Sequence, residues 1–180
     1  MILSDFDIKS MVSQKRLTIE PLTDDSIREN GIDFRLADEV ARHKAFDESF
    51  VLDPTDENMI KGSYKLDKTL KEIVINPHEQ VLLSTYESIS MPDDVAGFVE
   101  LRSTWARHGL SMPPTIIDAG FNGTITLEVV NNAPYKILLR PGQRFAHIIL
   151  EKLNNKTGKV YNGNYNMQKG IKLPQVLGKN

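Results

Sequence analysis

Residues 124–130 read Thr-Ile-Thr-Leu-Glu-Val-Val, and apolar side chains occupy every second position of this stretch. This alternation predicts a β-strand that has Ile125, Leu127 and Val129 on one face. The opposite face carries Thr124, Thr126, Glu128 and Val130. A carboxylate on such a strand is costly unless it is paired or used. Burial would raise the pKa of Glu128 and suit it to general acid–base catalysis, whereas a cross-strand salt bridge or an exposed face is the structural alternative.

Similar short runs extend on both sides of this stretch. We expect strands at 32–36, 73–75, 80–86, 95–101, 136–139 and 145–150. Turn signals such as Asn-Pro, Pro-Asp-Asp, Asn-Gly and Pro-Gly separate these runs. Many short strands at regular spacing predict a mainly β protein, built as a sandwich or a barrel.

The N-terminal segment carries a helix signal. Ser4 can cap a helix, Asp7 stands three positions later where a capping-box partner belongs, and the helix should end near Gln14. Residues 17–20 suggest a short strand that stops at Pro21. Residues 38–72 are polar and irregular, and we expect a long excursion there, with a hairpin as an option and little chemistry.

Composition excludes several classes of protein. The chain has 180 residues, with 22 basic against 24 acidic side chains, which suits one globular domain and argues against a nucleic-acid-coating protein. The absence of cysteine excludes disulfides, thiolate zinc sites and a cysteine nucleophile. No apolar run could span a membrane, and the N-terminus does not resemble a signal peptide. We therefore expect a cytoplasmic protein with neither nucleic acid nor membrane as a partner.

The densest constellation of functional side chains is residues 102–107, Arg-Ser-Thr-Trp-Ala-Arg, which follows a predicted strand. Ser103 could cap a helical turn whose free N–H groups attract an anion, and Arg102 and Arg107 would add bidentate donors for a triphosphate. Alternatively, both arginines are solvated or pair with Glu100. Trp105 is expected to be a packing residue.

A second constellation surrounds Asp118, in the stretch Ile-Ile-Asp-Ala-Gly-Phe-Asn-Gly at 116–123. This carboxylate could accept a hydrogen bond from a sugar hydroxyl or orient a water. It could equally stabilise its own turn. Of the four histidines none stands in a metal-binding spacing, and His147 is expected to be structural.

Taken together, four motifs resemble the dCTP deaminases of the dCTP deaminase/dUTPase superfamily. They are Asn-Gly-Ile-Asp-Phe-Arg-Leu at 30–36, Arg-Ser-Thr-Trp-Ala-Arg at 102–107, Ile-Asp-Ala-Gly-Phe-Asn-Gly at 117–123 and Thr-Leu-Glu at 126–128. The resemblance runs from Met-Ile-Leu-Ser-Asp at 1–5 to the tail segment 161–170. Order and spacing agree, so the set is specific although each motif alone is weak.

The resemblance implies one domain over 1–180, a jelly-roll-like β-clip subunit of the dUTPase-like type, with a short N-terminal helix and a second short helix after a central strand. It implies a homotrimer with active sites between subunits, and a mobile lid over the nucleotide at 154–180. The implied reaction is zinc-independent deamination of dCTP to dUTP and ammonia, with Mg²⁺ carried by the triphosphate.

The resemblance also assigns roles to individual residues. Glu128 is the implied general acid–base, and Ser103 and Arg107 would position the water and stabilise charge. The substrate-binding set comprises Arg102, Ser103, Thr104, Trp105, Ala106, Arg107, Asp118, Thr126, Leu127, Glu128, Gln143, Tyr161 and Gln168. Asp118 would face the deoxyribose, and Thr126 and Leu127 would line the base site.

Two departures from the family pattern affect the site. Asn164 stands where the tail usually has a lysine, so Lys159 or Lys169 would have to substitute. The stretch 111–117 is also shorter than the common form. The alternatives are a bifunctional dCTP deaminase/dUTP diphosphatase, a diphosphatase alone, and a noncatalytic nucleotide-binding trimer. Glu128 favours deamination, whereas Asp118 does not separate a deaminase from a diphosphatase.

Overall fold

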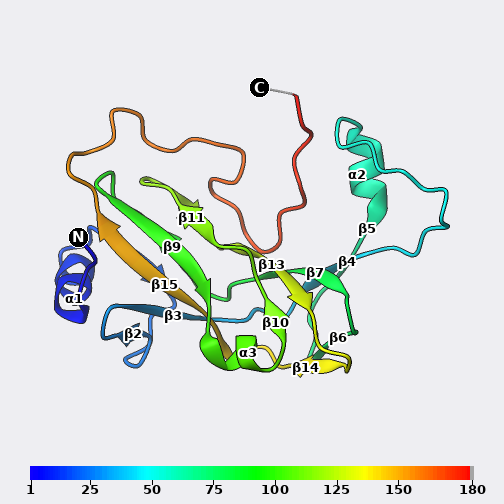
Figure 1. Cartoon of the computed structure of the whole chain (residues 1–180). Coiled ribbons are helices and arrows are strands. Elements are labelled where there is room, and N and C mark those ends of the chain that lie inside the picture. The colour runs from blue at the N-terminus through cyan, green and yellow to red at the C-terminus, as the bar shows by residue number, and fades with distance from the viewer. Residues whose placement is uncertain (179–180) are drawn as a thin grey trace.

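The computed structural model describes residues 1–178. Its elements are α1 (Asp5–Ser13), β1 (Thr18–Glu20), β2 (Ile27–Arg28), β3 (Gly31–Arg35), β4 (Val40–His43), α2 (Glu57–Ser63), β5 (Tyr64–Asp67), β6 (Ile73–Ile75), β7 (Gln80–Ser84), β8 (Ser88–Ser90), β9 (Val95–Leu101), α3 (Ser103–Arg107), β10 (Leu110–Ser111), β11 (Thr115–Ile117), β12 (Asn122–Gly123), β13 (Thr126–Asn131), β14 (Ile137–Leu139) and β15 (Arg144–Lys152). The predicted mainly β fold is confirmed (Figure 1).

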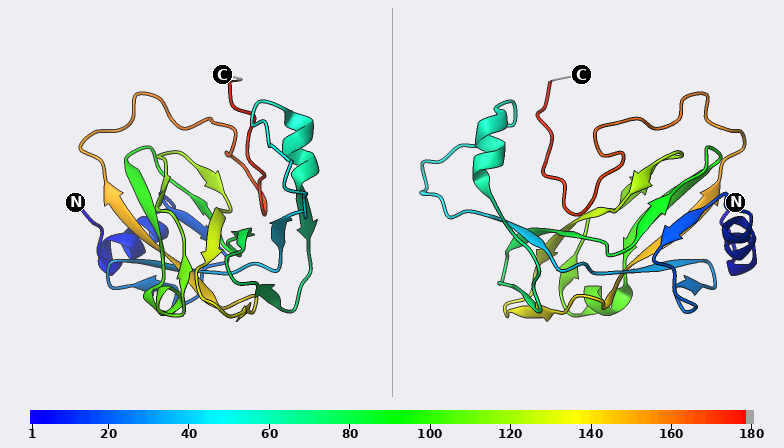
Figure 2. Two further views of the ribbon diagram at one scale, coloured as in Figure 1. Left: turned by 45° about the vertical axis from the view of Figure 1, so that its right-hand side comes forward. Right: turned by 180° about the vertical axis from the view of Figure 1, so that it is seen from behind.

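Two five-stranded sheets form the body of the molecule. One has the order β10-β13-β7-β4-β5 and the other β11-β9-β15-β3-β2, and all their pairings are antiparallel. A three-stranded and a two-stranded sheet complete the β structure. Figure 2 shows the sheets folding around a common interior, with α1 at one end of the body and α2 at the other.

Alternating side chains place the core between these sheets. The expected inward residues of β13, Leu127 and Val129, are fully buried, and Ile125 just before the strand is buried as well. Phe34 and Phe145 are among the largest fully buried side chains. Apolar burial of this kind is the main stabilising contribution in a β fold.

The N-terminal helix agrees with its sequence signal. In α1 the Ser4 hydroxyl accepts from the Asp7 backbone N–H, and the Asp7 carboxylate accepts from the Ser4 N–H. Gln14 is the residue that ends it. Within residues 1–178, no helix is both long and apolar enough to cross a bilayer.

The predicted cap of α3 is wrong. Arg102, not Ser103, is the N-cap residue, and no side chain caps this helix. Ser103 already lies inside the first turn, because the strand β9 ends at Leu101 and the chain turns at once.

The excursion at 38–72 is more regular than its composition indicates. It contains β4, α2 and β5, and the two strands pair antiparallel from Val40–Asp67 to His43–Tyr64. Asp56 begins α2 by accepting hydrogen bonds from the backbone N–H groups of Asn58 and Met59. The hairpin is therefore present, with a helix inserted into its connection.

The C-terminal tail returns across the body of the molecule. From residue 153 to 178 it forms no helix and no named strand, and Figure 2 shows it passing over the sheets toward α2. The predicted lid at 154–180 is described as far as Gly178, and its last two residues lie outside the described part. Its mobility and its role over a nucleotide stay predictions.

Candidate functional site

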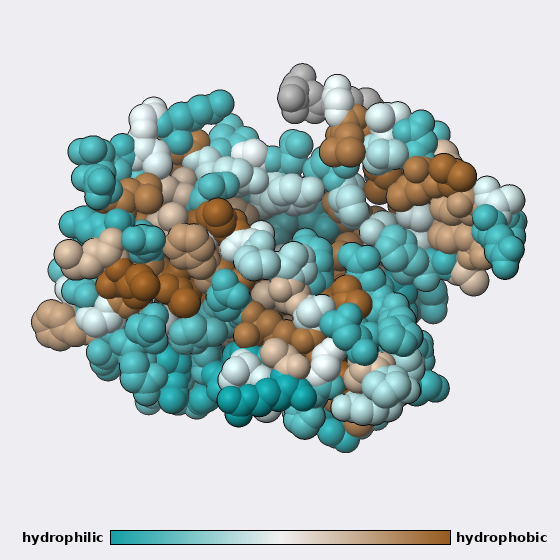
Figure 3. Space-filling model, in the orientation of Figure 1, coloured by the Kyte–Doolittle hydropathy of each residue, from teal (hydrophilic) through white to brown (hydrophobic). Residues whose placement is uncertain are grey.

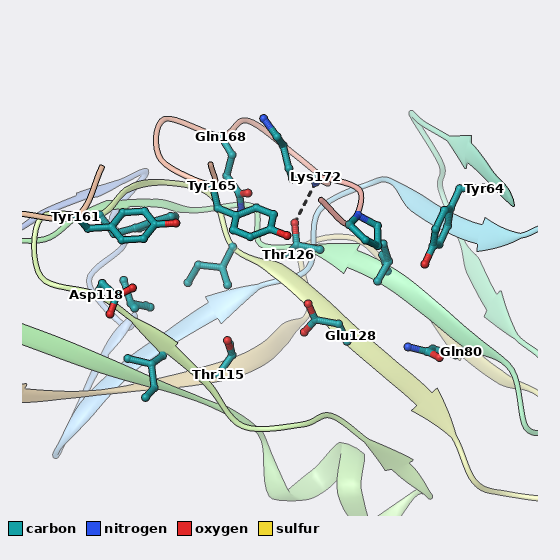
Figure 4. A pocket seen from close by; sticks show the side chains of 16 residues that line it. Tyr64, Gln80, Thr115, Asp118, Thr126, Glu128, Tyr161, Tyr165, Gln168 and Lys172 are labelled. Atoms are coloured by element: carbon teal, nitrogen blue, oxygen red, sulfur yellow. Dashed lines mark hydrogen bonds between the residues drawn. The ribbon is translucent and has the colours of Figure 1, made fainter. Parts of the chain in front are cut away.

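A cavity of about 360 Å³ opens between the sheets and the tail. Its polar lining comes from β5, β7, β11, β13 and the tail (Figure 4). The polar lining residues are Tyr64, Gln80, Thr115, Asp118, Thr126, Glu128, Tyr161, Tyr165, Gln168 and Lys172. Five of the residues expected from the sequence, Asp118, Thr126, Glu128, Tyr161 and Gln168, are thus brought together.

Glu128 lies in the middle of this lining, as Figure 4 shows. It is half-buried on β13, opposite Leu82 of β7. Burial raises its pKa above the ordinary glutamate value of 4.5. Among the described residues no lysine, arginine or histidine forms an ion pair with it. The structure therefore does not contain the cross-strand salt bridge that the sequence left open.

The neighbours of Glu128 on β13 divide between the two faces of the strand. Thr126 lines the cavity, and its hydroxyl accepts from the backbone N–H of Lys172 at 3.0 Å. The Leu127 side chain is fully buried in the core, so it does not line this cavity. Period-two alternation explains this correction, since adjacent residues of a strand point to opposite faces.

Asp118 follows β11 and is exposed at the edge of the cavity. Its main-chain carbonyl accepts from the Phe121 N–H at 3.1 Å, which closes the turn. Because this bond uses the backbone, the carboxylate stays available to a ligand hydroxyl.

The tail is anchored beside the cavity through main-chain and side-chain bonds. The side-chain amide of Gln168 donates to the Thr124 carbonyl at 2.5 Å. The side-chain oxygen Oε1 of Gln168 is buried and has no hydrogen-bond partner among the described residues. Gly123 has φ +139°, and a Cβ there would meet the Gln168 main chain at 2.6 Å. Glycine thus permits the close approach of the tail. Tyr161 packs on Phe121, with ring centroids 6.0 Å apart.

A buried carboxylate fixes the end of this anchored segment. Glu39 accepts from the Ser84 hydroxyl and from the Ile171 backbone N–H, each at 2.7 Å. Gly170 passes close by with φ +70°, where a Cβ would meet the carboxylate. These contacts place the neighbouring Lys172 at the mouth of the cavity.

Four polar residues line the cavity that were not expected from the sequence: Tyr64, Gln80, Tyr165 and Lys172. Gln80 was in a predicted strand, where alternation puts it on the same face as Leu82, but the pairing that brings this face to Glu128 is not indicated by the sequence. Tyr64 belongs to the stretch from which little chemistry was expected. Lys172 lies in the cavity, whereas the lysines named as substitutes, Lys159 and Lys169, do not line it.

The segment 102–107 forms α3 and its N-cap, and it does not line this cavity. Arg102 forms an ion pair with Asp33, a fully buried carboxylate of β3 that also bonds the His147 ring at 2.9 Å. This is a third arrangement, neither solvated nor paired with Glu100. Asp33 and Arg102 are therefore held together, and His147 is part of the same network.

The other members of this segment differ in exposure. Ser103, Thr104, Ala106 and Arg107 are exposed. Trp105 donates to the Arg144 carbonyl at 2.9 Å and packs on Phe145, as expected of a packing residue. Gln143 is half-buried and accepts from the Arg140 N–H at 2.7 Å. We call residues 102–107 with Gln143 the α3 cluster.

The donor side chains within residues 1–178 form no metal centre. No group of three or more histidine, aspartate or glutamate side chains is positioned to hold an ion. Among the described residues, neither the cavity nor the α3 cluster thus gathers protein ligands for a dedicated metal.

Comparison with known proteins identifies the family of the chain. The family model described as dCTP deaminase-like matches residues 2–153. A dCTP deaminase of Pyrobaculum arsenaticum is 45% identical over 177 residues, covering 98% of each chain. A dCTP deaminase of Aeropyrum pernix is 43% identical over 180 residues, covering 100% of this chain and 99% of the other.

Solved structures are similar in fold. The 2′-deoxycytidine 5′-triphosphate deaminase of Agrobacterium tumefaciens superposes with a TM-score of 0.65 at 21% identity, over 83% of this chain and 46% of that one. A mutant dUTPase of S. aureus phage phi11 gives a TM-score of 0.51 at 14% identity, over 82% and 98%. These likenesses confirm the predicted dUTPase-like fold, and the sequence matches show that the chain belongs to the dCTP deaminase-like family.

Proposed function

We propose that this protein hydrolyses dCTP to dUTP and ammonia. The observation that carries the proposal is a half-buried Glu128 at the centre of a cavity, without a cationic partner among the described residues and with its pKa raised by burial. The names of the full-length relatives support the choice of substrate. A carboxyl group tuned in this way can both accept and return a proton near neutral pH.

In the proposed mechanism the ionised Glu128 takes a proton from a water molecule as its oxygen attacks C4 of the cytosine ring. The new C4–O bond makes C4 tetrahedral and breaks the C4=N3 double bond, and the proton passes from Glu128 to ring nitrogen N3. Glu128 then delivers the second proton of that water to the amino group, the C4–N bond breaks, and ammonia leaves. One water is consumed, and the carboxylate is regenerated. Asp118, at the cavity edge, would accept from the sugar hydroxyl.

The α3 cluster would act on the same substrate in a second copy of the chain. Arg107 and Ser103 are exposed and remote from this subunit's cavity, although the family resemblance assigns them to the water and the nucleotide. Apolar surface over β9 and β11 offers an interface (Figure 3). There Phe98 and Ile116 pair in register and are 37% and 61% exposed. A homotrimer with shared sites accounts for both observations. Sedimentation at several protein concentrations tests this arrangement, and a monomer at all of them would contradict it.

Magnesium would reach this site with the triphosphate. The donor set fits that role, since the cavity offers one carboxylate at its edge, Asp118, and no group of three ligands. Substrate phosphates and water would then supply most of the ligands, as is common for Mg²⁺. When bound, the ion neutralises phosphate charge. We also place the activity in the cytoplasm, a reducing compartment that suits a chain without cysteine.

The test is product analysis after incubation of the protein with dCTP and Mg²⁺. The proposal expects dUTP and ammonia, and Glu128→Gln should abolish both while leaving dCTP binding intact, because an amide cannot shuttle a proton. dUMP with pyrophosphate would indicate the bifunctional enzyme. If dCTP stays intact but dUTP is cleaved, the protein is a diphosphatase. Turnover of neither nucleotide, with binding retained, would favour a noncatalytic nucleotide-binding protein.

A further inference from the structure

The sheet that carries Glu128 continues across three more strands beyond β13. Glu128 pairs with Leu82 of β7, so the two side chains share one face of the sheet. Gln80 stands two positions before Leu82 and is therefore on that face as well. Both Gln80 and Glu128 line the cavity.

The same register extends this face to β5. Leu82 pairs with Ala41 of β4, and His43, two positions further, pairs with Tyr64 of β5. Tyr64 therefore projects from the same face as Glu128. The His43 ring packs against the Tyr64 ring, with the centroids 4.4 Å apart and the planes tilted by 35°.

The orientation of Tyr64 agrees with this placement. Figure 4 shows its hydroxyl directed into the cavity, on the same side of Glu128 as Gln80, while Asp118 and Tyr161 lie on the other side. Burial, followed by the negative charge of Glu128, raises the pKa of Tyr64 above 10.0. The phenol thus keeps its proton near neutral pH and can act as a hydrogen-bond donor.

We propose that Tyr64 is a positioning residue for Glu128, and this inference rests on the proposed function. Its hydroxyl donates to a water molecule that bridges to the Glu128 carboxylate, and thereby orients the carboxylate and favours its ionised form.

Among the described titratable side chains that line the cavity beside Glu128, Tyr64 is the one that comes from the same sheet. The remaining titratable side chains that line the cavity are Asp118, Tyr161, Tyr165 and Lys172. Lys172 lies at the mouth, and Tyr161 comes from the tail on the opposite side of Glu128 from Tyr64 (Figure 4). Tyr165 also comes from the tail, and its hydroxyl accepts from the Gln175 backbone N–H at 3.4 Å. His43 packs against the Tyr64 ring.

The test compares Tyr64→Phe with Tyr135→Phe. The first substitution keeps the ring and its contact with His43. The control removes a hydroxyl from an exposed tyrosine outside the cavity, which contacts the His108 carbonyl at 3.4 Å. For each protein we would measure kcat/KM for dCTP against pH, together with the melting temperature. We would also titrate the Glu128 carboxyl by ¹³C NMR, assigning its signal by loss in Glu128→Gln.

Losing a donor disfavours the ionised carboxylate, so the Glu128 pKa should rise in Tyr64→Phe. The acid limb of kcat/KM should move to higher pH by about one unit, and the NMR titration should move with it. The ionisation of dCTP is common to all the proteins and cancels. Tyr135→Phe should leave both curves unchanged. A packing role for Tyr64 would lower the melting temperature without moving either curve.

The two measurements separate this inference from the proposed function. If the wild-type protein does not deaminate dCTP, the proposed function fails, and the carboxyl titration still decides the role of Tyr64. A Glu128 titration that is the same in Tyr64→Phe and in wild type would overturn the inference, whether or not the protein is active.

Discussion

Replacing Asp33 with asparagine should weaken both the fold and the binding of nucleotide. The Asp33 side chain has no exposed surface, and its carboxylate bonds Arg102 and His147. Arg144 lies 3.9 Å from the same carboxylate. Asparagine keeps the shape but removes the negative charge that faces Arg102 and Arg144, and its NH₂ group would face one of the former donors.

The size of the effect follows from burial. Breaking a fully buried ion pair costs roughly 3–5 kcal/mol, and a hydrogen bond to a charged group contributes about 1.5–3 kcal/mol. Arg102 and His147 are 32% and 23% exposed, so water can partly replace the lost partner. We therefore expect a loss of about 2–3 kcal/mol. In a chain of this size that lowers the melting temperature by about 4–12 °C.

Thermal melts followed by circular dichroism would measure this loss, at one fixed protein concentration because assembly shifts apparent stability. Asp38→Asn is the matched control, since Asp38 is exposed and should stay within about 0.5 kcal/mol of wild type. The KM for dCTP should also rise in Asp33→Asn, because Arg102 loses the group that orients it. An Asp33→Asn protein that melts with the control and has an unchanged KM would refute the reasoning.

Four further expectations concern the core and the cavity. Leu127→Ala should cost about 2–5 kcal/mol in urea denaturation, because its side chain is fully buried, and a loss below that of an exposed-site variant would contradict the packing described. Because the pKa of Glu128 is raised in the folded protein, folding favours the protonated carboxyl. This contribution to the free energy of unfolding is complete below the ordinary pKa of 4.5 and is lost as the pH rises through the pKa in the folded protein. Glu128→Gln should therefore melt no lower than wild type at pH 7. In activity profiles the acid limb of kcat/KM should lie above the range of an exposed glutamate, because the carboxyl must be ionised to take a proton. Lys172→Ala should raise the KM for dCTP more than Lys169→Ala, since only Lys172 lines the cavity; equal effects would remove it from the nucleotide site.

Local signals in the sequence were sufficient for much of the fold. The predicted strands at Ile73–Ile75 and Val95–Leu101 match β6 and β9, and the Ser4–Asp7 capping box is present. Alternation and capping depend on neighbours a few residues apart, so sequence patterns capture them. The helix α2 was not predicted, because its sequence lacks apolar residues at helical spacing, although Asp56 could be identified as an N-cap.

The candidate site was predictable only in part. Asp118, Thr126 and Glu128 lie close in sequence, and the structure brings them together. Tyr64 reaches the same cavity through the pairing of β4 with both β5 and β7, a contact between segments far apart in the chain. Single-sequence patterns do not indicate which strands pair. For the same reason they could not show that the α3 cluster lies apart from Glu128.

That separation has a genetic consequence. If neighbouring copies share each site, a copy that lacks the Glu128 carboxylate has a defective cavity, whereas a copy that lacks Arg102 has a defective α3 cluster. Either variant alone would be inactive. In a mixed oligomer, however, some sites would take Glu128 from one variant and Arg102 from the other. Two recessive alleles would then rescue one another in the same cell, whereas a double mutant on one chain would have nothing to exchange.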